Sequence, residues 1–256
     1  IQPGAMEARV KRIESHHSSL AEGSPSQRTA LNLTGVPVES LKRGQILYRS
    51  GFFTESDEII ARVQLLDRKR ELKNNTGIEV LIGTAAVRAK IILLEGEATT
   101  STQFPARIKF AEPWFSYPGQ PLILTGPGGF RIIGGGRVLF PGYRPGQHRD
   151  RVRENLDLFG SYALDEYILF MVTVRVWMKQ EELHSLFPDG DDDIARACGN
   201  LLDRGVIKKL GDVIMNAAAL DAVRGRIIDA VNRHVGLNLK EVSDTADADQ
   251  EICRLI

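Results

Sequence analysis

Arg28 is the residue whose type and position most clearly suggest a binding role. It opens an apolar stretch, RTALNL (28–33), that alternates as a β-strand does. An arginine at the edge of a sheet usually extends its guanidinium into water. The other interpretation is recognition of an anion, because the guanidinium is rigid and always charged. The residues alone leave both interpretations open.

Two adjacent histidines, His16 and His17, raise the question of a metal site. They stand at the end of a stretch, 6–16, that alternates as a strand, and neighbouring side chains of a strand point to opposite faces. Ligation by both histidines is therefore not expected, while a single functional histidine stays open. The acidic run DGDDD (189–193) lacks the spaced ligands and final glutamate of a calcium loop, so it predicts the start of a helix. No metal site is predicted.

Common catalytic motifs are absent from the sequence. It contains no G-x-x-x-x-G-K-[ST] loop, no H-E-x-x-H and no C-x-x-C. The stretches GPGGF (126–130) and GGGR (134–137) predict turns or bulges, since neither opens a helix. Cys198 and Cys253 are far apart and predict reduced thiols in a cytoplasmic protein. We therefore predict no catalytic residue and no cofactor for this chain.

The composition suits a chain of two or three packed domains. Of the 256 residues 43% are apolar, and 33 Lys+Arg balance 33 Asp+Glu, so any nucleic-acid surface must be local. No run approaches 18 apolar residues, so no membrane span is expected. The opening residues, IQPGAMEARV, lack an initiator methionine and the features of a signal peptide. They predict a chain cut from something longer.

Short alternating stretches make up the first 143 residues. They are punctuated by glycine and proline, which favours antiparallel barrels or sandwiches. The pattern predicts one β domain over 1–51 and a second over 52–143. Strands are expected over 6–16, 28–33 and 44–51, and then over 58–66, 77–84, 87–96, 104–114, 120–126 and 130–140.

The rest of the chain has a helical period. Residues 144–155 predict a basic linker, because proline and glycine stand there beside four arginines. Helix, short helix, helix and hairpin then follow in the order of a winged helix, which predicts such a domain over 156–220 and the start of a second over 221–256. The expected helices cover 158–174, 179–187, 191–207 and 219–235, and the hairpin turns at 210–212.

Three stretches carry a family resemblance. EARVKRIESHHSSLAEGSPSQRTALNLTGVPVESLKRGQIL (7–47) resembles the second, β-barrel domain of translational GTPases related to elongation factor Tu. IEVLIGTAAVRAKIILLEG (78–96) and ARIKFAEPWFSYPGQPLIL (106–124) resemble their third domain, which in one branch ends on a triple-glycine hairpin like RIIGGGRVLFP (131–141).

A third barrel followed by winged helices is the arrangement of the selenocysteine-specific elongation factors of bacteria. The resemblance covers essentially the whole chain and is loosest in the helices. It implies a multidomain β + α fold, with two antiparallel β-barrels (translation-factor domain II, in part, and domain III) followed by winged-helix modules.

The resemblance also implies roles for three residues. The position matching Glu14 abuts the terminal adenosine of the tRNA, and those matching His16 and Arg28 border the amino-acid pocket. The selenocysteine branch has arginine at the Arg28 position, whereas factors for ordinary amino acids tend to have asparagine. A guanidinium there favours a selenolate over a neutral serine hydroxyl. Ser26 departs from the family, which usually has glycine at that position.

The implied function is binding of selenocysteinyl-tRNA for delivery to the ribosome at recoded UGA codons, without chemistry by this chain itself. The GTPase domain, with GTP and Mg²⁺, would precede Ile1, and the winged helices that bind the selenocysteine-insertion mRNA hairpin would follow Ile256. No membrane partner is expected. One alternative is a related translational GTPase that carries another aminoacyl-tRNA. The second is a winged-helix DNA-binding regulator, although helix 192–204 offers only Arg196, Asn200 and Arg204 to base edges.

Overall fold

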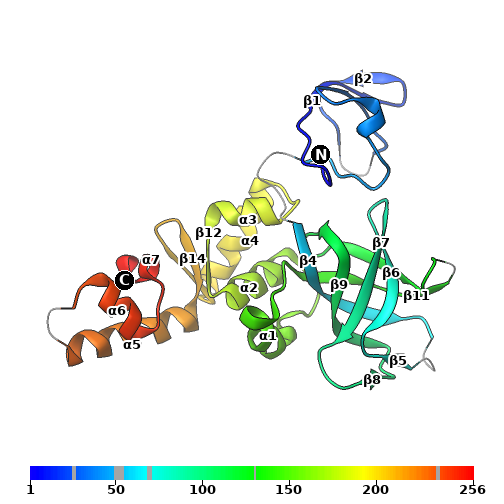
Figure 1. Cartoon of the computed structure of the whole chain (residues 1–256). Helices are drawn as coiled ribbons and strands as arrows, with labels where there is room; N and C mark the ends of the chain where they lie inside the picture. The colour runs from blue at the N-terminus through cyan, green and yellow to red at the C-terminus, as the bar shows by residue number, and fades with distance from the viewer. Residues whose placement is uncertain (25–26, 49–54, 68–70, 130, 235–236) are drawn as a thin grey trace.

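The computed structural model describes residues 1–24, 27–48, 55–67, 71–129, 131–234 and 237–256. Ser26 and the expected domain boundary at residues 51 and 52 lie outside these residues. Figure 1 shows a small N-terminal sheet, then a β-barrel, then a mainly helical half that extends away from the barrel.

The N-terminal part is a three-stranded antiparallel sheet in the order β2-β1-β3. The strand expected over 44–51 is wrong for its described part, where Ile46 forms only an isolated bridge with Gln2. Gly44 has a φ of +100°, which turns the backbone away from an extended course. The elements are β1 (Arg9–Ser15), β2 (Ser18–Leu20), β3 (Ala30–Thr34) and the 3₁₀ helix η1 (Val38–Ser40).

The second part is a closed antiparallel barrel in the order β10-β11-β4-β9-β7-β6, which confirms the predicted barrel. Alternation turns one set of side chains inward, as with Val87, Ala89 and Ile91 of β7, which are buried in the barrel core. The barrel strands are β4 (Glu55–Leu65), β6 (Thr76–Ile82), β7 (Ala85–Leu93), β9 (Gln103–Phe115), β10 (Pro121–Thr125) and β11 (Ile132–Pro141), and β5 (Leu72–Lys73) pairs with β8 (Ala98–Thr99) beside them.

The residues predicted as a basic linker, 144–155, instead form helix α1 (Pro145–Glu154). Pro145 stands in the first turn, where its fixed φ suits a helix, and Val152 is fully buried. Arg153 ties α1 to the barrel, because its Nη2 donates to the Leu94 carbonyl at 3.1 Å and lies 2.8 Å from Glu95 Oε1. The proline and glycine that predict a loop here belong to the beginning of the helix.

A second hydrophobic core joins the barrel to the helices. The outer face of β4 and β11 contributes Ile60, Leu139 and Phe140, and these pack with Phe159 and Phe170 of the helical half. Barrel and helices therefore bury one shared cluster at this boundary. The elements that follow α1 are η2 (Leu156–Leu158), α2 (Leu164–Arg175), β12 (Trp177–Lys179), α3 (Gln180–Leu186), α4 (Asp191–Asp203), β13 (Ile207–Leu210) and β14 (Val213–Asn216).

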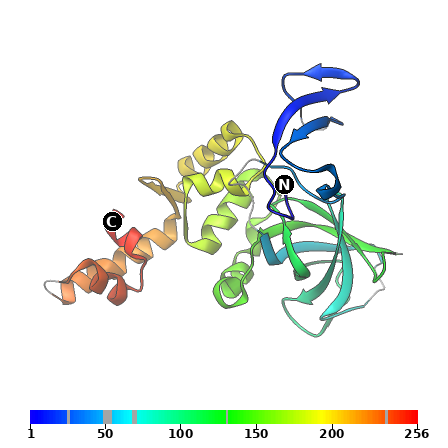
Figure 2. The same cartoon turned by 45° about the horizontal axis from the view of Figure 1, so that its top comes forward.

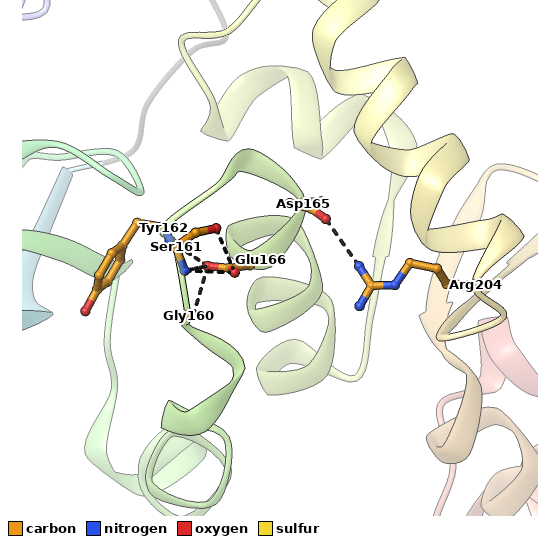
Figure 3. Close-up of polar contacts among 6 residues, drawn as sticks. All are labelled: Gly160, Ser161, Tyr162, Asp165, Glu166 and Arg204. Carbon is orange, nitrogen blue, oxygen red and sulfur yellow. Dashed lines mark hydrogen bonds and ion pairs between the residues drawn. The ribbon is translucent and has the colours of Figure 1, made fainter.

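Helix α2 begins at Leu164, later than the expected residue 158, because Glu166 holds the preceding segment as a loop. Its carboxylate accepts the backbone N–H groups of Gly160, Ser161 and Tyr162 at 3.1, 3.0 and 2.6 Å (Figure 3). These N–H groups are thereby satisfied outside a helix. Beside them, Arg204 Nη1 lies 3.2 Å from Asp165 Oδ2, which links the end of α4 to the start of α2.

The Glu166 loop should make part of the stability depend on pH. Burial raises the pKa of Glu166, but the hydrogen bonds from Ser161, Tyr162 and Gly160 outweigh it and hold this pKa below its ordinary value. The ionised carboxylate therefore stabilises the fold above the pKa of the unfolded chain. This contribution should disappear as the pH falls through the lowered folded-state pKa.

We expect Glu166→Gln to lower the free energy of unfolding at pH 7 by about 1–2 kcal/mol, as for the loss of a helix cap. The difference from the wild type should shrink as the pH falls below 4. Urea unfolding at several pH values measures it, with Glu112→Gln on the exposed face of β9 as the control. A Glu166→Gln effect that stays constant down to pH 3 would contradict the role of the charge.

The C-terminal part adds a three-stranded sheet, β12-β14-β13, and three helices. The sheet confirms the predicted hairpin at 210–212. A third apolar cluster joins this sheet to the helices through Met215, Leu220 and Ile252. None of the helices in the described part of the chain is long and apolar enough to cross a membrane. The helices are α5 (Ala217–Arg233), α6 (Leu239–Ala246) and α7 (Gln250–Leu255).

Candidate functional site

The sheet brings the backbones of the three predicted site residues to one end. Glu14 lies on β1, where it pairs with Ser19 of β2 and Ala30 of β3. His16 follows in the β1–β2 turn, and Arg28 stands two positions before the first residue of β3. The buried side chain of Ser15 donates to the Arg28 carbonyl oxygen at 3.0 Å, which fixes the Arg28 backbone beside the turn.

His16 and His17 form a tight turn and not the end of a strand. Their φ angles are +49° and +65°, and Ser15 pairs with Ser18 across them. A two-residue loop with both φ angles positive matches the twist of antiparallel strands, and histidine enters this region more readily than most residues. The strand expected to reach residue 16 therefore ends at Ser15. The described residues contain no cluster of His, Cys, Asp or Glu able to hold a metal ion.

At this end of the sheet Glu14 forms an ion pair, whereas Arg28 forms none with the described residues. Glu14 Oε1 lies 2.8 Å from Arg12 Nε; the Arg12 side chain is exposed and that of Glu14 is partly buried. The guanidinium of Arg28 is exposed and forms no ion pair with any residue that the structure describes. It is therefore open to an incoming anion, while its backbone is held in place by Ser15.

A second polar surface, not singled out from the sequence, lies on the outside of the barrel. Arg88 and Lys90 of β7 and Arg107 and Lys109 of β9 point outward, since the residues between them are buried. Lys90 stands directly opposite Lys109, an arrangement that costs stability in a sheet unless an anion lies near. The four side chains border a hollow of about 650 Å³. We call them the basic barrel face.

Acidic residues flank the basic barrel face on both sides. Glu79 of β6 stands opposite Arg88 and lines the same hollow. Glu58 of β4 is buried and lies 2.9 Å from Arg107 Nε and 3.6 Å from Lys109 Nζ. Among the described residues, neither Arg88 nor Lys90 has an ion-pair partner. The signal was present in the sequence, because VRAK and ARIK place cations at alternate positions of two strands.

The N-terminal sheet stands at the end of the barrel where β6 turns into β7 (Figures 1 and 2). The Gly44 N–H donates to Thr84 Oγ1 in that turn at 3.1 Å. Between the two parts lies a hollow of about 1020 Å³ that includes Trp114. The N-terminal part is therefore in contact with the barrel at the β6–β7 turn through the segment around Gly44.

No family model matches the chain, but its sequence is similar to those of individual translation elongation factors. It is 22% identical over 171 residues to the selenocysteine-specific elongation factor of Desulfomicrobium baculatum, covering 66% of this chain and 27% of that protein. It is 30% identical over 95 residues to elongation factor 1-alpha of Pyrobaculum calidifontis, covering 37% and 21%. The chain thus spans about a quarter of the length of these curated relatives.

A solved structure extends the likeness to the helices. The crystal structure of a bacterial selenocysteine-specific elongation factor superposes on 96% of this chain and 39% of its own, with a TM-score of 0.68 and 16% identity. The arrangement of the N-terminal sheet, the barrel and most of the helical half therefore matches the arrangement in that solved structure. The chain is a homologue of the selenocysteine-specific elongation factors and shares the fold of a bacterial one over nearly all its residues.

Proposed function

We propose that this chain is the tRNA-binding part of a selenocysteine-specific translation elongation factor. The observation that carries the proposal is the exposed guanidinium of Arg28, which has no ion-pair partner among the described residues and is anchored through its backbone to Ser15. A selenol is far more acidic than a serine hydroxyl, so selenocysteine on a tRNA is a selenolate at neutral pH. A fixed cation favours that anion, while serine offers only a neutral hydroxyl.

Glu14 and His16 take the neighbouring roles in this proposal. The tRNA end would enter along the β1–β2 turn, with Glu14 at the terminal adenosine and His16 at the border of the amino-acid pocket. The basic barrel face supplies what the rest of the tRNA needs, since most protein contacts to nucleic acids go to the phosphate backbone. Ribosomes and GTP are further partners, and hydrolysis of GTP with Mg²⁺ would belong to a separate domain. Such a role would place the protein in the cytoplasm.

The helical half is proposed to be a winged helix that acts as a spacer. Its order α2, β12, α3, α4, β13, β14 is the order of that fold. Three aspartates open α4, which makes the start of this helix a poor surface for phosphates. In this proposal, recognition of the selenocysteine-insertion mRNA hairpin falls to other domains.

Two alternative functions are less well supported than binding of selenocysteinyl-tRNA. A factor for another aminoacyl-tRNA is favoured by the 30% identity to an elongation factor 1-alpha, but the arginine at position 28 speaks against it. A DNA-binding regulator needs free side chains on α4. There Arg196 pairs with Asp193 and Arg204 with Asp165, which leaves Asn200 alone of the three candidates.

Protection of the aminoacyl ester tests the proposed function. The full-length protein with GTP should slow hydrolysis of selenocysteinyl-tRNA and leave seryl-tRNA on the same tRNA nearly unprotected. The two substrates differ only in selenium and oxygen, so the tRNA body is its own control. Equal protection of both would move the proposal to a factor for another aminoacyl-tRNA, and protection of neither would reject tRNA delivery.

A further inference from the structure

The junction between the barrel and the helices contains a cleft lined by several cations. It has a volume of about 990 Å³ and lies between the start of β4, the end of β11, and helices α1 and α2. Arg144, Arg151 and Arg175 line it together with His148 and Lys109. We call it the junction cleft.

The cations are held around the His148 ring. The Arg144 backbone N–H donates to His148 Nδ1 at 3.1 Å, so the neutral ring carries its proton on Nε2 as a donor. The ring packs edge-on against Phe140 with centroids 4.9 Å apart. Burial lowers the pKa of His148, and the nearby charges of Arg175, Arg144 and Arg151 lower it further. The ring therefore remains a neutral donor among three guanidinium groups.

The three arginines are only partly satisfied. Arg151 Nη1 donates to the Val174 carbonyl at 3.2 Å, and Arg175 Nη1 lies 3.3 Å from Glu182 Oε2. Arg144 is exposed and its guanidinium has no ion-pair partner in the described part of the chain. One carboxylate therefore serves three guanidinium groups on this wall.

The opposite wall carries acidic residues, which matter for the test. Glu58 is already paired with Arg107 and Lys109. Glu55 and Asp57 of β4 are exposed at the rim. They lie opposite the arginines and would oppose an anion that approached along their side of the cleft.

The junction cleft continues the basic barrel face. Lys109 lines both the cleft and the hollow bordered by Arg88 and Lys90. The cations therefore form a row from β7 across β9 to the N-terminus of α1, interrupted on β4 by the buried Glu58 that already pairs with Arg107 and Lys109. A polyanion with regularly spaced charges, such as an RNA backbone, can follow such a row, whereas a single small anion would use one end of it.

We propose that the junction cleft binds a phosphate of the same RNA that lies on the basic barrel face, with Arg144 as its principal contact. The part of the helical half that borders the barrel would then contact RNA, while the rest of it, including α4, would keep the role of a spacer. This inference rests on the proposed function for the identity of the partner. It adds a binding site for the RNA phosphodiester backbone at residues of α1 and α2.

Binding of an unmodified selenocysteine tRNA transcript, followed by fluorescence anisotropy at several salt concentrations, tests this site. We expect Arg144→Gln to weaken binding by about 5- to 10-fold and to reduce the slope of log affinity against log salt by about one, as for one lost phosphate contact. Glu55→Gln removes a negative charge from the rim of the cleft, so this variant should bind the transcript about twofold more tightly than the wild type. Arg233→Gln removes one positive charge from α5, away from the cleft, and should leave both the affinity and the salt slope unchanged.

The outcomes separate this inference from the proposed function. If Lys90→Gln weakens binding and Arg144→Gln does not, the cleft is overturned while RNA binding by the barrel stands. If Arg233→Gln weakens binding as much as Arg144→Gln, the effect is one of net charge and the cleft is overturned. Equal competition by a polyglutamate peptide would indicate an acidic protein segment instead of RNA. If the wild type does not bind the transcript, the cleft is overturned, while the proposed function is decided separately by the protection of selenocysteinyl-tRNA.

Discussion

Replacing Arg28 with alanine should remove most of the preference for selenocysteinyl-tRNA over seryl-tRNA. A hydrogen bond to a charged group contributes about 1.5–3 kcal/mol, so the ratio of the two affinities should fall by about 10- to 100-fold. The structure supports a large effect, because the guanidinium is exposed and unpaired among the described residues while its backbone is held by Ser15. Most of the loss should be in binding of the selenocysteinyl form, since a serine hydroxyl gains little from a cation.

Two variants make the Arg28 result specific. Arg28→Lys keeps the charge but loses the planar fork of donors, so it should retain part of the preference. Lys11→Ala removes an exposed cation from β1 of the same sheet and should leave the preference unchanged. The measurement is the rate of ester hydrolysis with protein and GTP present. A preference that survives Arg28→Ala would keep the tRNA-binding role and reject Arg28 as the discriminator.

The sequence predicts the barrel well because the chemistry of each strand is local. Alternation in a stretch such as 87–91 states which side chains face inward, and the structure follows it. The turn at His16 and His17 is missed because it lacks the glycine or asparagine that usually marks positive φ. Helix α1 is missed because its beginning contains Pro145 and Gly146 and its inner face contributes only one fully buried side chain, Val152.

The candidate site shows a different limit of sequence reasoning. Arg28 stands out by type and position, but its place beside Glu14 depends on strand register, which distant pairing decides. The same holds more strongly for the junction cleft. Lys109, Arg144 and Arg175 come from a barrel strand and two helices, and only the shared core of Phe140 and Phe170 brings these elements together. No pattern within a single segment of the sequence predicts that these three side chains lie close together.

The triple glycine of β11 leads to a second large expected effect, on stability. A Cβ at Gly136 would lie 2.2 Å from the Arg62 carbonyl oxygen and 3.1 Å from its carbon, both backbone atoms of β4. The neighbouring Ala61 and Val63 of β4 are fully buried, and β4 is hydrogen-bonded to β11 on one side and β9 on the other. The backbone therefore has nowhere to move without opening the closed barrel.

We expect Gly136→Ala to lower the free energy of unfolding by about 3 kcal/mol, at the upper end of the cost of overpacking. Gly77→Ala on β6 is the matched control, because a Cβ there meets nothing within 4 Å. In a strand this change should be neutral or slightly stabilising, since alanine restricts the unfolded chain. Urea unfolding of the barrel can be followed by Trp114 fluorescence in a Trp177→Phe background. Equal losses at both glycines would mean that flexibility, and not the clash with β4, requires glycine in this strand.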